Sequence, residues 1–143
     1  HANHVIAVAG QTGELVPLYC TAHGKALLAD ATERDLKAQF GSGPLQKYTK
    51  STITSIQALA KDCIAIKKRG FSTDEAEYQE EIRCVAAPIR IQNGVIVGSI
   101  GVSAPSSRFT KDLYPQYSRQ VCKVANDIGI LLSSPEHKTD EID

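Results

Sequence analysis

The stretch from Ile82 to Ser103, IRCVAAPIRIQNGVIVGSIGVS, decides the fold. Its two runs, 82–91 and 95–103, are rich in β-branched residues and are joined by QNG. An Asn-Gly pair between such runs is the strongest short-range signal for a β-hairpin, because both residues accept the positive φ angles of a tight turn. The stretch therefore predicts two antiparallel strands.

One face of this hairpin is predicted to be small and mildly polar. Side chains alternate along a strand, which places on that face Ile82, Cys84, Ala86, Ser99, Gly101 and Ser103. The other face carries branched side chains such as Val85, Ile100 and Val102. Small side chains leave space where a core needs bulk, so either a bound small molecule or a closely packed helix is expected over this face.

Helices are predicted on both sides of the hairpin. A short helix follows Thr21, a good N-cap residue, and a second short helix spans 33–40. A longer helix begins after Ser55 and ends at the basic residues and glycine of KKRG, 67–70. An amphipathic helix at 110–132 closes the domain.

The remaining segments are predicted to be extended or irregular. HVIAVA at 4–9 is typical of a strand, and 15–18 is expected to be a second extended stretch. The acidic segment 70–81 is interpreted as a solvated loop, although one of its carboxylates could contact a ligand hydroxyl. This order of elements predicts an α+β domain with one antiparallel sheet, helices packed on it, and a pocket between sheet and connecting segments.

The helix after Thr21 begins with unusually polar chemistry, in LYCTAHGKALLA at 18–29. The first N–H groups of a helix have no intrahelical partner and can hold a carboxylate, with Thr21 or His23 adding hydrogen bonds. Alternatively, Thr21 is only a cap and His23 a solvated side chain. Cys20 and His23 could also be a nucleophile with its base, but no third orienting residue is identifiable, so no catalytic site is expected.

The four cysteines, Cys20, Cys63, Cys84 and Cys122, are scattered without a CxxC pair. Closed zinc sites need four converging ligands, and disulfide frameworks belong to small secreted domains. We therefore expect reduced thiols, with no bound metal and no cofactor.

Length and charge limit the function classes. The chain has 143 residues, and we expect one domain at 1–134 followed by a disordered tail at 135–143. Sixteen basic residues balance sixteen acidic ones, which excludes nucleic-acid binding by this segment alone. No apolar stretch approaches the roughly 20 residues of a membrane span and no signal peptide is visible, so a cytoplasmic protein without a membrane partner is expected. There is no methionine, and we expect the chain to be a piece of a larger protein.

Three segments together resemble a known family. VPLYCTAHGKALLA, KKRGFSTDEAEYQEEIRCVAAPI and GVIVGSIGVSAPSSRFT are similar, in order and spacing, to the C-terminal effector-binding domain of IclR-type (isocitrate lyase regulator) transcription factors. The resemblance extends from about Gly13 to Leu132. It departs from the usual pattern at His23, where a small or aliphatic residue is common, and at Glu81 and Ala104, where glycine is common.

The resemblance implies a GAF-like α+β fold that binds a small metabolite, usually an organic acid or an aromatic compound. The positions that match the family pocket are Val16, Ala22, His23, Asp74, Ile82, Cys84, Gly101 and Ser103, and the helix start adds Thr21. It also implies a winged helix-turn-helix domain, absent from this chain, through which a homodimer or homotetramer binds operator DNA.

The polar character of these positions favours a small hydroxy or keto acid, such as a sugar-acid catabolite, over a bulky aromatic compound. Two other functions remain open on the sequence alone. One is a GAF-type sensory module with a different output, such as a kinase or cyclase. The other is a small thiol- or metal-dependent enzyme, with Cys20, His23 and Cys84 as candidate ligands.

Overall fold

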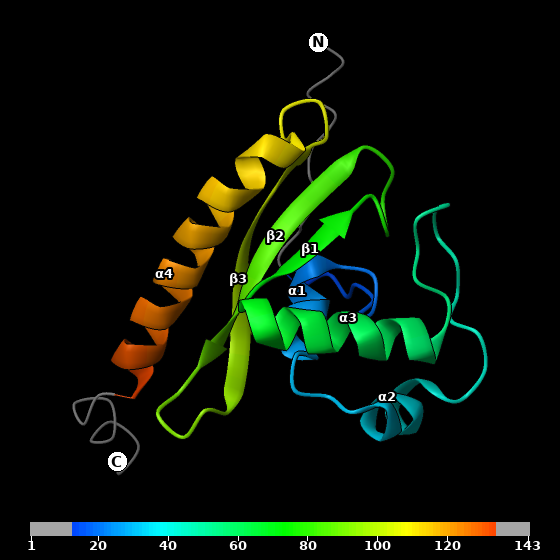
Figure 1. The fold of residues 1–143 in the computed structure, drawn as a ribbon, viewed down its shortest axis with the longest axis horizontal. Helices are drawn as coiled ribbons and strands as arrows, with labels where there is room; N and C mark the ends of the chain where they lie inside the picture. The colour runs from blue at the N-terminus through cyan, green and yellow to red at the C-terminus, as the bar shows by residue number, and fades with distance from the viewer. Residues whose placement is uncertain (1–12, 134–143) are drawn as a thin grey trace.

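Three antiparallel strands form the centre of the structure (Figure 1). β1 spans Ser72–Glu75, β2 spans Ile82–Arg90 and β3 spans Ile96–Pro105, in the sheet order β1-β2-β3. The computed structural model describes residues 13–133, so the strand expected at 4–9 and the tail expected at 135–143 lie outside the described residues. The predicted hairpin, β2 with β3, is confirmed.

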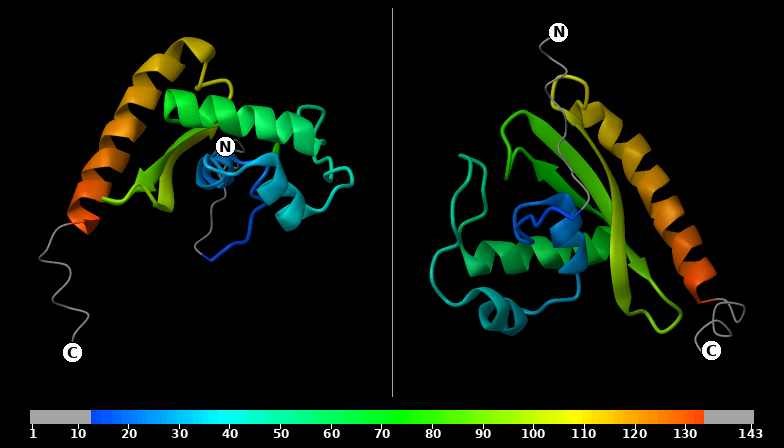
Figure 2. Two further views of the ribbon diagram at one scale, coloured as in Figure 1. Left: turned by 60° about the horizontal axis from the view of Figure 1, so that its bottom comes forward. Right: turned by 180° about the vertical axis from the view of Figure 1, so that it is seen from behind.

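The register of the hairpin produces the predicted small face. Cys84 pairs with Ser103, and Ala86 pairs with Gly101. Helix α1, Ala22–Leu27, packs on this face through its alanines, which form a buried cluster with Ile82, Cys84 and Ala86. In the view from behind, α1 lies in front of the strands (Figure 2).

Helix α4, Tyr114–Leu132, covers the opposite face of the sheet (Figure 1). Its Val121 and Ala125 form a buried cluster with larger side chains of β2 and with Phe109. The helix predicted from residue 110 begins later than expected, because 111–113 form a short 3-10 helix, η2. Pro115 lies in the first turn of α4, where a missing N–H costs no hydrogen bond. Within residues 13–133, no helix has the length and apolarity that crossing a membrane requires.

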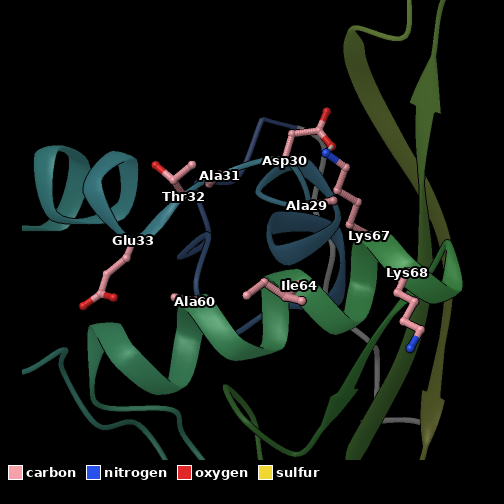
Figure 3. Close-up of a pocket in the computed structure, with 9 residues that line it drawn as sticks. All are labelled: Ala29, Asp30, Ala31, Thr32, Glu33, Ala60, Ile64, Lys67 and Lys68. Carbon is pink, nitrogen blue, oxygen red and sulfur yellow. Dashed lines mark ion pairs between the residues drawn. The ribbon is translucent and has the colours of Figure 1, made fainter.

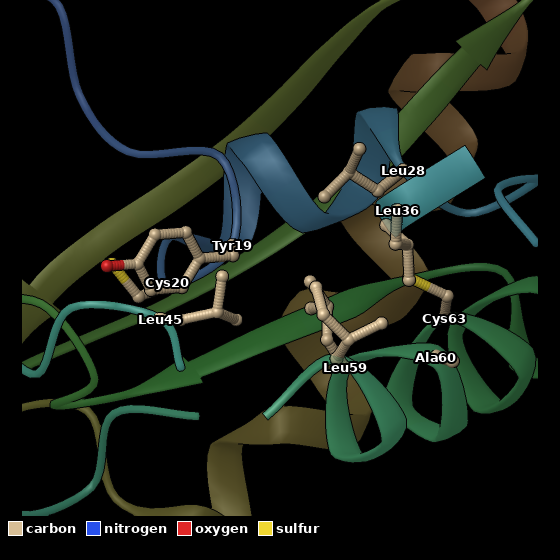
Figure 4. Close-up of a cluster of buried hydrophobic side chains, with 9 residues drawn as sticks. Tyr19, Cys20, Leu28, Leu36, Leu45, Leu59, Ala60 and Cys63 are labelled. Carbon is tan, nitrogen blue, oxygen red and sulfur yellow. The ribbon is translucent and has the colours of Figure 1, made fainter. Parts of the chain in front are cut away.

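A third cluster lies between α1, α2 (Glu33–Phe40) and α3 (Ile56–Arg69), away from the sheet (Figure 4). Its buried members are Tyr19, Cys20, Leu28, Leu36, Leu45, Ile56, Leu59, Ala60 and Cys63. Figure 4 shows Cys63 of α3 directed toward Leu36 of α2 and Leu28 near the end of α1. This cluster fixes α1 from the side that the sheet does not cover.

The predicted helix ends are confirmed by cap hydrogen bonds. The Thr21 hydroxyl accepts the N–H of Gly24 at 3.1 Å, and Ser55 accepts the N–H of Ala58 at the same distance. α2 begins with a full capping box between Thr32 and Asp35. α3 ends at Gly70, whose φ of 90° lies in the left-handed region that glycine enters without strain.

Two predictions about the connecting segments are wrong. The segment 70–81 is not a solvated loop throughout, because its residues 72–75 form β1 on the edge of β2 and bury Asp74 and Glu77. A four-residue strand with an inward-facing acid lacks the alternation of apolar residues that marks a strand in sequence. Residues 15–18 form no strand either, because the chain turns there into α1 and the Pro17 carbonyl accepts the Thr21 hydroxyl at 2.7 Å.

Candidate functional site

A cavity of about 160 Å³ lies at the start of α1, between the small face of the hairpin and the segment that follows β1. Every site residue predicted from the sequence lines it except Gly101. The lining consists of Val16, Thr21, Ala22, His23, Asp74, Tyr78, Gln79, Ile82, Cys84 and Ser103. The structure thus brings together side chains that come from four separate stretches of the chain.

Gly101 lies in β3 opposite Ala86 and serves the sheet itself. A Cβ atom at Gly101 would lie 2.4 Å from the carbonyl oxygen of Val85 and 2.8 Å from the Cβ of Ala86. Only glycine therefore lets the two strands approach this closely beside the cavity.

Cys84 and Ser103 form a polar pair on the strands that line the cavity. The Cys84 Sγ lies 2.8 Å from the Ser103 Oγ, and either atom can be the donor. Burial raises the pKa of the Cys84 thiol to about 11, so the thiol is neutral at physiological pH. The pair can offer a hydrogen-bond donor and an acceptor to a hydroxyl or keto oxygen, but it is a poor source of thiolate.

The start of α1 presents donors to the same space. The Thr21 hydroxyl is fully used, because it caps Gly24 and donates to Pro17. The backbone N–H groups of Ala22 and His23 have no hydrogen-bond partner among residues 13–133, and both residues line the cavity. Burial lowers the pKa of His23, so its imidazole is neutral near pH 7. Thr21 therefore acts as the cap, whereas the backbone N–H groups of Ala22 and His23 have no acceptor within residues 13–133.

Asp74 forms the acidic part of the wall. Its side chain is almost inaccessible, with the residue 4% exposed, and its Oδ1 accepts the N–H of Glu77 at 2.8 Å. Burial, with a further contribution from the charge of Glu77, raises the pKa of Asp74 to about 7. Near neutral pH a protonated fraction of Asp74 can donate a hydrogen bond to an anionic ligand.

Sequence reasoning missed three residues near the cavity: Tyr78, Gln79 and Lys25. Tyr78 and Gln79 belong to the segment interpreted as a solvated loop. Lys25 has the sequence features of an ordinary helix former, yet it is 1% exposed and its Nζ binds Asp62 and Glu77. No local pattern marks a buried lysine whose partners are 37 and 52 residues away in the sequence.

The thiols do not form a catalytic or metal-binding group. Burial raises the pKa of Cys20 to about 12, and Cys20 belongs to the core between α1 and α3 rather than to the cavity lining. All four cysteines are unpaired. Among the described residues, no three His, Cys, Asp or Glu side chains gather as a metal site would require.

A larger groove of about 480 Å³ lies elsewhere, between the α1–α2 turn and α3 (Figure 3). Its charged groups are already engaged at one end, where Asp30 pairs with Lys67 at 3.6 Å and with Arg90 at 2.7 Å. The side chains of Glu33 and Lys68 point away from the centre of this groove (Figure 3). No convergent set of buried polar groups lines it, so the smaller cavity is the better candidate for a ligand site despite its volume.

Comparison with known proteins places the chain in a family. Residues 2–130 match the family described as "Bacterial transcriptional regulator IclR C-terminal". The HTH-type transcriptional repressor AllR of Escherichia coli K12 is 29% identical over 133 residues, which are 93% of this chain and 49% of AllR. The chain thus spans about half the length of the curated relatives it matches.

Two solved structures are similar in fold and sequence. The IclR structure of Thermotoga maritima has a TM-score of 0.80 and 32% identity, covering 88% of this chain and 51% of that one. The C-terminal domain of the E. coli transcriptional regulator KdgR has a TM-score of 0.77 and 30% identity, covering 85% of this chain and 74% of that one. The α+β architecture, an antiparallel sheet with packed helices, is therefore that of the IclR C-terminal, GAF-like domain.

Proposed function

We propose that this chain, which belongs to the IclR family of bacterial transcriptional regulators and is the C-terminal effector-binding domain of such a regulator, binds a small hydroxy or keto acid in the cavity at the start of α1. As such a domain it is not an enzyme, and it works in the cytoplasm, where bacterial transcription is regulated. The observation that carries the proposal is the convergence of Ala22, His23, Asp74, Cys84 and Ser103 on one small cavity.

The size of the cavity supports a compact ligand. Its volume is about 160 Å³, and a protein cavity of about 150 Å³ is known to hold benzene, which has six non-hydrogen atoms. Short acids such as pyruvate, lactate and glycerate have about this size. An aromatic acid adds a carboxylate to a ring of that size and would fill more than the volume of the cavity.

The chemistry of the wall supports an acid with a second oxygen function. A carboxylate can accept hydrogen bonds from the backbone N–H groups of Ala22 and His23 and from protonated Asp74. A hydroxyl or keto oxygen matches the Cys84–Ser103 pair, at 2.8 Å from each other. Val16 and Ile82 supply the apolar part of the wall.

For the whole protein we propose the regulatory role that the relatives' names describe. AllR is an HTH-type transcriptional repressor, and this chain matches about half of it. An N-terminal winged helix-turn-helix domain would read operator DNA, and effector binding would shift the population of domain arrangements in a homodimer or homotetramer. The sugar-acid catabolites remain candidates for the effector.

Thermal denaturation against a panel of acids tests the proposal. The panel contains pyruvate, lactate and glycerate, with benzoate as the aromatic comparison. A ligand present at 100 times its Kd stabilises the folded state by about 2.7 kcal/mol, which raises the midpoint by about 5–10 °C. The expected result is a shift with at least one aliphatic acid that is lost in Ser103→Ala, which removes the hydroxyl of the Cys84–Ser103 pair.

Ser107→Ala is the matched control, because Ser107 lies exposed in the turn after β3 and outside the cavity. It should keep the full shift. Stabilisation by benzoate alone would contradict the proposed class of effector, and a shift that survives Ser103→Ala would place the acid outside this cavity.

A further inference from the structure

We propose that Lys25 is a positioning residue of the effector site, which clamps the segment after β1 through Glu77 and thereby holds Asp74 in the cavity wall. The effect on affinity rests on the proposed function, whereas the clamp itself does not. Lys25 does not line the cavity, so any influence on a ligand must pass through the residues that it holds.

The contacts of Lys25 join three parts of the chain. Its Nζ lies 2.8 Å from Asp62 Oδ2 on α3 and donates to Glu77 Oε2 at 3.1 Å. Glu77 Oε1 lies 2.9 Å from the same Nζ but has no hydrogen bond of good geometry among the described residues. Lys25 is 1% exposed, so its charge depends on these two carboxylates rather than on water.

Glu77 in turn organises the start of the segment. Its backbone N–H donates to Asp74 Oδ1 at 2.8 Å, and its Oε2 accepts the N–H of Glu75 at 3.3 Å. The ammonium of Lys25 and the carboxylate of Asp74 are thus linked through a single residue. Loss of the ammonium would leave Glu77 as a buried anion without a cationic partner, and the carboxylate would have to move toward water.

The backbone of the segment after β1 adopts a costly conformation, which surrounding contacts have to stabilise. Ala76 has a φ of 59° and Glu81 a φ of 66°, and both residues carry a Cβ that makes this left-handed region costly. Thr49 and Thr52 also hold the segment, because their hydroxyls donate to the Ala76 and Glu77 carbonyls, each at 2.6 Å. These bonds fix the backbone, and the charge of Lys25 fixes the side chain of Glu77, which joins the segment to α1.

Hydrogen exchange tests the clamp without any effector. In Lys25→Met, the amides of 75–82 should exchange at least about tenfold faster than in the wild type, which corresponds to about 1.4 kcal/mol. The amides of β2 beyond Val85 should keep their rates. Glu77→Gln removes the charge but keeps the size of the side chain, and it should show the same local change to a smaller extent.

Leu36→Ala is the control for loss of stability alone, because Leu36 is a fully buried residue of the cluster between α1, α2 and α3 and takes no part in the bonds that join Lys25, Glu77 and Asp74. It should accelerate exchange globally and not at 75–82 in particular. The clamp is disproved if exchange at 75–82 stays at the wild-type rate in both Glu77→Gln and a folded Lys25→Met, or follows the global change seen in Leu36→Ala. If Lys25→Met does not fold, Glu77→Gln alone decides.

A double-mutant cycle then tests the effect on the ligand. The probe is pyruvate, lactate or glycerate, whichever shifts the wild type most, and its Kd is measured by calorimetry. Lys25→Met should weaken binding at least about tenfold when Asp74 is present and less than about twofold in the Asp74→Asn background. Equal losses in both backgrounds would show that Lys25 does not act through Asp74. If no acid of the panel binds, the proposed effector class fails, and the exchange result still decides the clamp.

Discussion

Asp74 is a carboxyl group surrounded by other acids, with Glu75 and Glu77 beside it and Lys25 as the nearby cation. In its buried position the neutral form is favoured, and its pKa rises to about 7. The same four residues, Asp-Glu-Ala-Glu at 74–77, would have ordinary side chains if they were exposed to water. Burial therefore decides the chemistry of this residue, and burial depends on how β1 pairs with β2.

The raised pKa of Asp74 predicts an unusual pH dependence of stability. Between about pH 4 and pH 7 folded Asp74 keeps a proton that the unfolded chain has lost, so the free energy of unfolding falls as pH rises through this window. The loss is at most about 4 kcal/mol and is complete above pH 7. In urea unfolding at pH 5 to 8, Asp74→Asn should flatten this fall and be more stable than the wild type at pH 8.

Asp30 gives the comparison of opposite sign. The hydrogen bonds of Arg90 hold the pKa of Asp30 below its usual value, so its stabilising effect is present above that value and is lost only in acid. Asp30→Asn should therefore be less stable than the wild type at pH 8. If the free energy of unfolding of the wild type falls between pH 5 and 7 no more than that of Asp74→Asn, the assignment to Asp74 is refuted.

At the scale of elements, features that depend on neighbouring residues can be predicted from the sequence, whereas features that depend on distant contacts cannot. The hairpin and the starts of α1 and α3 depend on neighbours in the chain, namely the Asn-Gly pair and the caps Thr21 and Ser55, and these were predicted correctly. β1 depends on pairing with β2, and the burial of Lys25 depends on partners on α3 and after β1. Their own residues carry no periodic pattern, so neither was predictable.

The cap of α3 offers a test of this local coding. Ser55→Ala removes the acceptor of the Ala58 N–H and should lower the free energy of unfolding by about 1 kcal/mol. Ser51→Ala, at an exposed serine whose hydroxyl caps no helix, should change it by less than about 0.5 kcal/mol. Chemical denaturation measures both. Equal values for the two variants would mean that packing, and not the cap, sets the start of α3.

At the scale of the whole molecule, the two faces of the sheet are packed with side chains of different size. The face under α4 is filled with large side chains such as Val85, Ile89 and Phe109. The face under α1 carries small ones and leaves the cavity at its end. The sequence indicated this division through strand alternation and indicated most of the cavity lining through the family resemblance, whereas the cavity's size required the structure.

The balanced charge of the chain predicts how it behaves toward DNA. With a formal net charge of zero, it should release few counterions from a phosphate backbone. In a gel-shift experiment at 150 mM salt we expect no retardation of duplex DNA up to a protein concentration of about 10⁻⁴ M, the weak limit of non-specific binding. A salt-sensitive shift at micromolar protein would assign DNA contacts to this domain itself.

If the effector binds in this cavity, as we propose, the thiol of Cys84 can report whether the cavity is occupied. Cys20 and Cys63 are fully enclosed in the helical core, and Cys122 lies outside the cavity. At alkaline pH, where part of the Cys84 thiol is ionised, a maleimide or a disulfide reagent that reaches it has to enter the space in which the proposed effector would sit. Protection of this one sulfur from modification can therefore rank candidate metabolites, and even fractions of a cell extract, before the natural inducer has been identified.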